Sequence, residues 1–103
     1  MMTDIEKQFN DDMMHIYVTA KKELGYNATR FLQMISKYGG LSTAHKLIAT
    51  EGGTEGFTKL WEYGRLDLSV EAHVLKPEYE VLFSEEERNM CRERLKSYGW
   101  SNA

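Results

Sequence analysis

The stretch DIEKQFNDDMMHIYVTAKKELG, residues 4–25, decides the fold. Its apolar side chains recur every three or four residues, at Ile5, Phe9, Met13, Ile16 and Ala20. This spacing places them along one face of an α-helix. The glycine at position 25 follows directly, where a left-handed residue commonly ends a helix. The pattern predicts an amphipathic helix over residues 4–24, and its apolar face requires partner helices to cover it.

Shorter segments with the same periodicity follow, and glycines separate them. We expect further helices over about 28–38, 43–50, 57–63, 69–75 and 85–98. Asn27 and Ser42 suit the N-cap positions of the second and third helices. The sequence EGGTEG at 51–56 predicts a loop, because three glycines in six residues disfavour a helix.

The later elements carry their own signals. RLDLSV, residues 65–70, alternates polar and apolar side chains and also fits a short strand, but the apolar spacing beyond it favours a helix from Ser69. Pro77 suits the first position of a further turn. Ser84 and Glu87 form the pattern of a capping box at the start of the last helix.

These elements predict an all-α fold: a compact single-domain bundle over residues 1–103, with five to six short helices and one longer N-terminal helix. A chain of 103 residues can bury a core without disulfides or metals. With 42% hydrophobic and 28% charged residues, the composition is that of an ordinary globular protein, which argues against disorder.

A single cysteine, Cys91, rules out an intramolecular disulfide and favours a reducing compartment. The first residues show neither a basic leader nor an apolar run, and no segment reaches the ~20 apolar residues of a bilayer-spanning helix. We therefore expect a cytoplasmic protein that has no membrane partner.

Catalytic signals are weak. His15, His45 and His73 are far apart in sequence and match no paired-ligand motif, and no glycine-rich phosphate loop is present. We therefore expect no metal, no cofactor and no enzymatic activity. Cys91 falls on the inward side of the last helix, where a thiol usually acts as a small hydrophobe. The alternative is a reactive thiolate activated by the neighbouring arginines.

The sequence WEYGRLD, residues 61–67, places three charged side chains around a glycine. We expect Arg65 to bridge Glu62 and Asp67 and so fix the angle between two short helices, because a guanidinium can bind carboxylates with two parallel hydrogen bonds. The alternative is a polar functional site beside Trp61.

Residues 28–50 superficially resemble a helix-turn-helix, and they provide the alternative function of nucleic-acid binding. The polar and basic side chains that would contact nucleic acid are Lys37, Ser42, Thr43, His45 and Lys46. Against this reading, the second helix of the pair lacks Arg, Asn and Gln, which are the usual readers of base edges.

Charge is distributed unevenly. Lys and Arg outnumber Asp and Glu in residues 21–46 and 88–103, whereas acidic residues dominate 47–87. A merged basic surface would favour nucleic acid or an acidic partner, and two separated surfaces would be ordinary solvated faces. Tyr26 and Trp100 lie at the ends of helices, where they either pack on the core or stay exposed as anchors for a protein partner.

Three stretches carry a resemblance to a known family: ELGYNATRFLQMISKYGG, GFTKLWEYGRLDLSVEAHVL and LFSEEERNMCRERLKSYG, all within residues 23–99. This region resembles a small bacterial helical domain of unknown function, which occurs alone or near the C-terminus of larger proteins, some associated with restriction or other defence systems. The resemblance implies a bacterial or phage accessory module and transfers no site residue. The N-terminal helix lies largely outside it.

Taken together, these features favour a non-catalytic module that binds another protein, as an adaptor or inhibitor in a phage, mobile-element or bacterial defence setting. The long N-terminal helix also allows a homodimer, since symmetric dimers are the commonest assembly.

Overall fold

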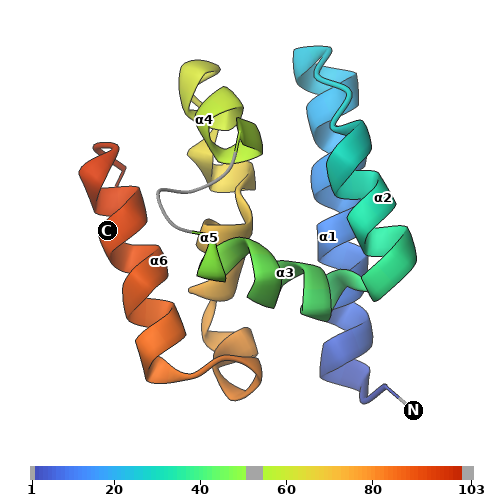
Figure 1. Ribbon diagram of the computed structural model, residues 1–103, viewed down its shortest axis with the longest axis vertical. Helices are drawn as coiled ribbons and strands as arrows, with labels where there is room; N and C mark the ends of the chain where they lie inside the picture. Colours follow the sequence, from blue (N-terminus) through green and yellow to red (C-terminus); the bar gives the residue numbers. More distant parts are fainter. Residues whose placement is uncertain (1, 51–54, 101–103) are drawn as a thin grey trace.

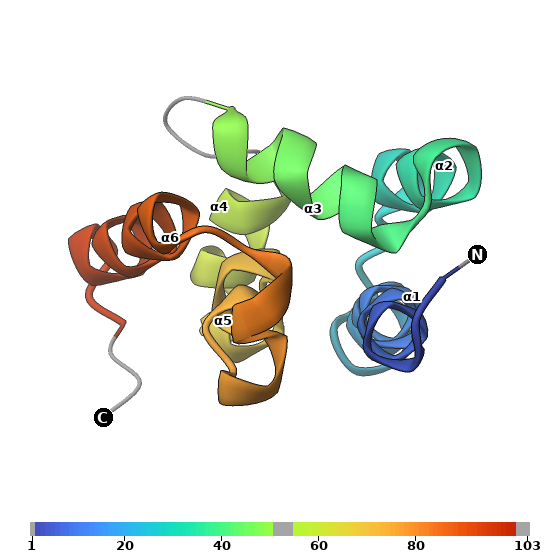
Figure 2. The same cartoon turned by 90° about the horizontal axis from the view of Figure 1, so that it is seen from below.

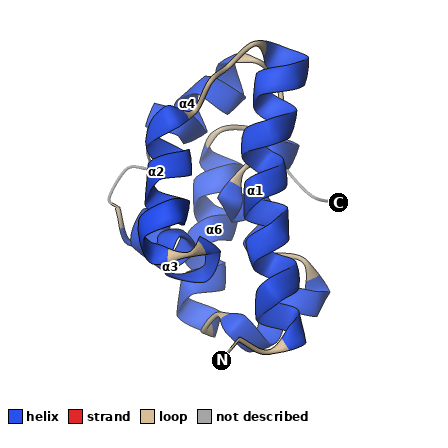
Figure 3. Ribbon diagram, turned by 90° about the vertical axis from the view of Figure 1, so that its right-hand side faces the viewer, coloured by secondary structure: helices blue, strands red, loops and turns tan. Residues whose placement is uncertain are grey.

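The computed structural model describes residues 2–50 and 55–100. Its α-helices are α1 (Asp4–Leu24), α2 (Thr29–Tyr38), α3 (Gly40–Ala49), α4 (Glu55–Glu62), α5 (Val70–Val74) and α6 (Glu85–Ser97), and its 3-10 helices are η1 (Leu66–Leu68) and η2 (Pro77–Leu82). Figure 3 shows these helices joined by short loops, with no strand in the two described ranges. The expected all-α bundle with a long N-terminal helix is confirmed.

The helices form two groups that α3 connects. α1 and α2 lie side by side at one edge of the molecule, and α6 lies at the opposite edge (Figure 1). α4 and α5 lie between the two edges, and α3 runs crosswise from α2 towards α6, as the view in Figure 2 also shows. None of the helices described is long and apolar enough to cross a bilayer.

The apolar stripe of α1 is covered within the chain. Phe9 and Met13 are completely buried, and the ring of Phe9 lies 4.9 Å from that of Tyr79 on η2 and 5.2 Å from that of Phe83. α1 thus packs on the core along its predicted face. A homodimer through α1 would have to use its outer face, where Val18 is 49% exposed.

A second, smaller apolar cluster joins α4 and η1 to the C-terminal end of α6. Its buried members are Phe57, Leu60, Leu66 and Leu95. Tyr98 and Trp100 pack against this cluster while remaining partly exposed. Burial of these side chains anchors the short α4, which has too few residues to be stable alone.

Local capping signals were informative at both long helices. The capping box of Ser84 and Glu87 is formed at the start of α6, as expected. Gly25 ends α1 in the left-handed conformation, with φ of 67°. A second capping box, between Thr3 and Glu6, begins α1.

Two predicted caps were wrong. Asn27 does not cap α2, because its side-chain oxygen accepts a hydrogen bond from Tyr17 on α1 at 2.7 Å. α3 begins before Ser42, at Gly40, whose N–H donates to the side-chain oxygen of Asn10 at 2.7 Å. A Cβ atom at position 40 would lie 2.8 Å from the Asn10 Cα, so only glycine permits this approach of α3 to α1.

The segment RLDLSV contains no strand. It forms η1, after which Ser69 caps α5 by accepting a hydrogen bond from the N–H of Ala72 at 3.1 Å. The expected helix start at Ser69 is therefore confirmed. A loop was expected over 51–56. Residues 51–54 lie outside the described part of the chain, and Glu55 and Gly56 belong to α4.

Candidate functional site

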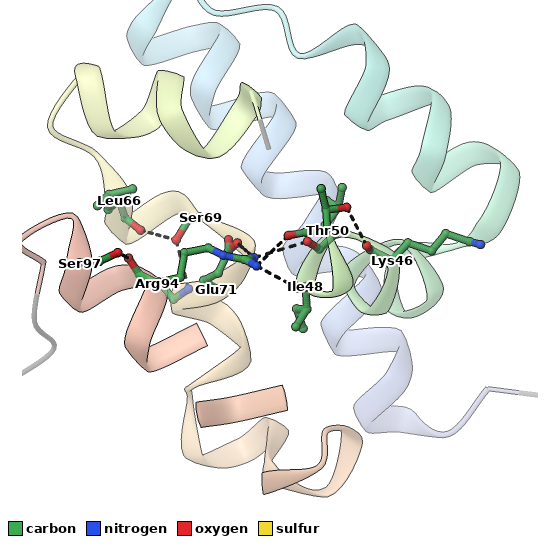
Figure 4. A network of polar contacts seen from close by, with 10 residues as sticks. Lys46, Ile48, Thr50, Leu66, Ser69, Glu71, Arg94 and Ser97 are labelled. Atoms are coloured by element: carbon green, nitrogen blue, oxygen red, sulfur yellow. Dashed lines mark hydrogen bonds and ion pairs between the residues drawn. The ribbon is translucent and has the colours of Figure 1, made fainter. Parts of the chain in front are cut away.

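Arg94 on α6 joins three helices at one point (Figure 4). Its guanidinium donates to the Glu71 carboxylate on α5 at 2.8 Å, and to the carbonyl oxygens of Ile48 and Thr50 at 3.0 and 2.9 Å. Those carbonyls lie at the C-terminal end of α3, where a helix leaves such groups without partners. The arginine therefore satisfies the end of one helix and balances the charge of a carboxylate on another.

Glu71 is an acidic side chain in the interior, with only 4% of its side chain exposed. Burial raises the pKa of Glu71, and the hydrogen bond from Arg94 opposes this effect. Arg94 binds Oε2, and no side chain in the described ranges donates to Oε1. A hydrogen bond from the backbone of Glu71 itself also favours the ionised carboxylate.

A cavity of about 600 Å³ lies beside Glu71, between the pair α1–α2 and the pair α4–α5. Its apolar walls include Ile16, Phe31, Met34, Leu47, Phe57 and Leu60. The charged side chains along it are Glu55, Glu71 and Arg30. A mostly apolar cavity with a few polar groups is the common form of a small-molecule site.

Four aromatic side chains, two of them exposed, gather at one end of the molecule. Trp61 and Tyr63, at the end of α4, are 47% and 48% exposed. The ring of Trp61 lies 5.4 Å from that of Tyr98 on an edge-on approach, and the ring of Tyr63 lies 6.5 Å from that of Tyr26. We call Tyr26, Trp61, Tyr63 and Tyr98 the aromatic end. It combines the α1–α2 connection with the last turns of α4 and α6, at the top of Figure 1.

For Tyr26 and Trp100 the sequence allowed two alternatives, packing on the core or exposure to a protein partner. Both side chains are half-buried. Trp100 packs on the second apolar cluster. Burial raises the pKa of the Tyr26 hydroxyl, and nearby Glu55 adds to the effect. Trp61 and Tyr63 are the more exposed aromatic side chains at this end.

The polar corner is formed with one different partner. Arg65 donates to both carboxylate oxygens of Asp67, at 3.1 and 3.3 Å, as expected. Its other partner is Glu23 at the end of α1, at 2.9 Å. Glu62 lies instead 3.7 Å from Lys59, one turn back on α4, so the predicted bridge from Arg65 to Glu62 was wrong. The hydrogen bonds that Arg65 donates to Asp67 and Glu23 raise the pKa of its guanidinium.

The lysines proposed for nucleic-acid binding meet at Tyr38. The Nζ atoms of Lys37 and Lys46 lie 5.3 and 4.5 Å from the centre of its ring, which is 42% exposed. Only Gly39 separates α2 from α3, which is shorter than the turn of ~3–4 residues in a helix-turn-helix. The two lysines therefore share a surface, although the segment lacks the spacing of the motif.

The remaining candidates of that segment are dispersed. Ser42 is exposed, whereas Thr43 is completely buried and has no surface to offer a nucleic acid. His45 packs its ring 4.9 Å from that of Phe83, and its Nδ1 lies 2.5 Å from the Glu87 carboxylate. His45 thus connects α3 to the start of α6.

The side chains considered for catalysis are not assembled. Cys91 is completely buried, and burial raises the pKa of its thiol to about 12, the opposite of an activated nucleophile. His73 is buried, and its Nδ1 lies 2.8 Å from the carbonyl oxygen of Ser69. Burial lowers the pKa of His73. His15 is exposed. Across residues 2–50 and 55–100, no group of three or more His, Cys, Asp or Glu side chains is placed to hold a metal ion.

The basic side chains of α2 are separated in space from those of α6, although α3 crosses from one helix towards the other. α2 and α6 lie at opposite edges, with α4 and α5 of the acidic middle between them (Figures 1 and 2). Arg88 and Arg92 on α6 also pair with Glu85, at 3.4 and 3.3 Å. The charges of Arg88 and Arg92 are therefore partly neutralised by Glu85.

Comparison with protein-family models, with curated proteins and with solved structures found no match. The resemblance of residues 23–99 to a defence-associated helical domain is therefore without support from these comparisons.

Sequence reasoning missed Tyr38, Glu71 and Arg94. Glu71 is an acidic residue inside the apolar run of α5, which is a signal of a buried charge, but its partner lies 23 residues away. Arg94 lies near the C-terminal end of the last helix, where a basic residue complements the helix dipole, and no local signal marks it as buried.

Proposed function

We propose that this chain is a non-catalytic protein-interaction module whose aromatic end binds a partner protein. The observation that carries the proposal is the half-exposure of Trp61, in the last turn of α4, and of Tyr63, directly after it. Aromatic side chains of this kind dominate the binding energy of protein interfaces. Each ring already rests against another aromatic ring, so little conformational entropy remains to be lost when a partner binds.

The charges around the aromatic end favour a partner with a basic rim. Glu23, Glu62 and Asp67 each keep half or more of their side chain exposed. Arg65, the guanidinium among them, is already paired with two of these carboxylates. Complementary charge at a rim speeds association and selects the partner. A protein that covers another in this way acts as an adaptor or inhibitor.

The test is photo-crosslinking in bacterial cells. A crosslinking amino acid replaces Tyr63 in the full chain, and a second variant carries it at Val81, which is 81% exposed on η2 at the opposite end of the molecule. We expect a defined partner from position 63 only. With the purified partner, Trp61→Ala should weaken binding about tenfold or more, and Val81→Ala should leave it unchanged. Equal effects of the two alanine variants would refute the proposal.

Nucleic-acid binding through residues 28–50 is the second candidate, and the approach of Lys37 and Lys46 to Tyr38 favours it. An exposed aromatic ring can stack on a base when the ammonium groups over it move to the phosphates. We expect single-stranded oligonucleotide affinity to fall steeply with salt, and the double variant Lys37→Glu, Lys46→Glu to abolish it. The absence of binding at low salt would remove this candidate.

A further inference from the structure

The cavity beside Glu71 changes from polar to apolar between its rim and its interior. Among the described residues that line it, the exposed ones are all polar or charged: Asn27, Thr29, Arg30, Thr50 and Glu55. The apolar residues of the lining are buried or half-buried, and the buried ones are Ile16, Ala20, Phe57, Leu60 and Val70. The volume of about 600 Å³ is within the usual range for a small-molecule site. A ligand that enters from solvent therefore passes a polar rim and reaches an apolar interior.

The two buried polar residues of the lining already have partners within the protein. The Ser69 hydroxyl donates to the carbonyl oxygen of Leu66 at 2.6 Å and accepts from the N–H of Ala72 at 3.1 Å. The Glu71 carboxylate is paired with Arg94 at 2.8 Å, as Figure 4 shows. Across the described part of the chain, no buried side-chain nitrogen or oxygen of a lining residue lacks a hydrogen-bond partner. The interior therefore holds no buried polar side chain that needs a ligand to satisfy it.

The charges of the lining do not select a charged ligand. Arg94 balances Glu71 in the interior, and at the rim Arg30 offsets Glu55. A ligand charge carried into the interior would leave water without gaining an unpaired partner, and such burial is costly. Apolar surface, in contrast, gains free energy when it leaves water for apolar walls. Apolar cavities in proteins accordingly take up neutral molecules such as benzene.

We propose that this cavity binds a neutral, apolar small molecule with an aromatic or aliphatic hydrocarbon body. The hydrocarbon body packs against Phe31, Phe57 and the other apolar residues of the lining. This site is distinct from the surface proposed for a partner protein. The cavity shares Tyr26 with the aromatic end, but the more exposed rings of Trp61 and Tyr63 do not line it.

The test titrates the full chain, labelled with ¹⁵N, with probes that share a phenylethyl body: neutral propylbenzene, phenethylammonium and hydrocinnamate. Propylbenzene and phenethylammonium have nearly the same shape, because they differ only in a terminal methyl group against an ammonium group. We expect propylbenzene to shift the amide resonances of Ile16, Phe57 and Val70, and each charged probe to bind at least about tenfold more weakly. No shift of these resonances by propylbenzene, or equally tight binding of either charged probe, would overturn the proposal.

Variants locate the site. Ala20→Phe should weaken propylbenzene binding at least about tenfold, because the larger side chain occupies space in which the ligand would be buried. Ala49→Phe, at an exposed position of α3 outside the lining, should leave the affinity unchanged. A folded Ala20→Phe protein that binds propylbenzene as tightly as the original chain would overturn the proposal. Trp61→Ala should not alter probe binding, and a loss of binding in this variant would place the probe at the aromatic end instead of in the cavity.

A measurement on the unaltered chain replaces Ala20→Phe if that variant does not fold. Nuclear Overhauser effects are expected between the ring protons of propylbenzene and the methyl groups of Leu47, Leu60 and Val70, which line the cavity. Their absence at saturating probe would overturn the proposal.

Discussion

Arg94 of α6 and Glu71 of α5 form an ion pair 2.8 Å long in the interior, with 10% and 4% of their side chains exposed. The pair is the point where α3, α5 and α6 meet. Removing one member leaves the other charge without its partner away from water, which costs far more than the loss of a surface pair.

Arg94→Met should therefore lower the free energy of unfolding by about 3–5 kcal/mol. The loss combines an unpaired Glu71 with uncapped carbonyl groups of α3. Arg92→Met, on the same helix but in an exposed pair with Glu85, should cost less than about 1 kcal/mol. Urea unfolding followed by circular dichroism measures both. Similar losses in the two variants would show that the interior pair contributes no more than a surface one.

Gly40→Ala should destabilise the protein by about 1–3 kcal/mol, because the added Cβ would lie 2.8 Å from the backbone of Asn10 and force α3 away from α1. Ser42→Ala in the same helix should change stability by less than about 0.5 kcal/mol, since Ser42 is exposed and does not cap α3. The same unfolding measurement compares them. If Ser42→Ala proves the more damaging, the start of α3 at Gly40 is incorrect.

Acid should destabilise the protein through Glu87. Partial burial raises the pKa of Glu87, but hydrogen bonds from the Ser84 backbone and from His45 outweigh this and hold the pKa below its ordinary value. The unfolded chain then binds the proton more readily than the folded one. The stabilising contribution is complete above the unfolded pKa of ~4.3 and is lost as the pH falls through the lower folded pKa.

Glu87→Gln should consequently reduce stability at neutral pH and flatten its decline between about pH 5 and pH 3. Unfolding curves recorded across this range, with Glu86→Gln as the exposed neighbouring control, provide the measurement. An unchanged acid slope in Glu87→Gln would show that other carboxylates carry the effect.

The thiol of Cys91 should be unreactive in the folded protein. It is completely buried, and burial raises its pKa to about 12, against ~8.5 for a free cysteine. At mildly alkaline pH, Ellman's reagent should modify the native chain at least about a thousandfold more slowly than the urea-unfolded chain. Comparable rates would restore Cys91 as a candidate nucleophile.

The sequence predicts those parts of the fold whose determinants are close together along the chain. The stripe of α1, the left-handed Gly25 and the capping box of Ser84 and Glu87 each depend on residues within a few turns of one helix. The failures depend on distant partners. Asn10 reaches Gly40 across 30 residues, and Glu23 reaches Arg65 across 42, so no local pattern announces either contact.

The candidate sites were less predictable for the same reason. Leu60 and Trp61 are neighbours on α4, yet one is buried and the other is 47% exposed. Which side of so short a helix faces solvent depends on where α6 and η1 pack against it. The cavity beside Glu71 arises between helices, and periodicity within one helix does not reveal it.

Both tryptophans of the chain, Trp61 and Trp100, belong to the part built by α4 and the end of α6. Intrinsic emission therefore reports on that part of the molecule, whereas the cluster around Phe9 and Tyr79 contributes no indole. Ellipticity averages over all the helices. If the two apolar clusters unfold at different temperatures, the unfolding midpoint from tryptophan fluorescence will differ from the midpoint from ellipticity. The difference between the two midpoint temperatures will measure how tightly the clusters are coupled.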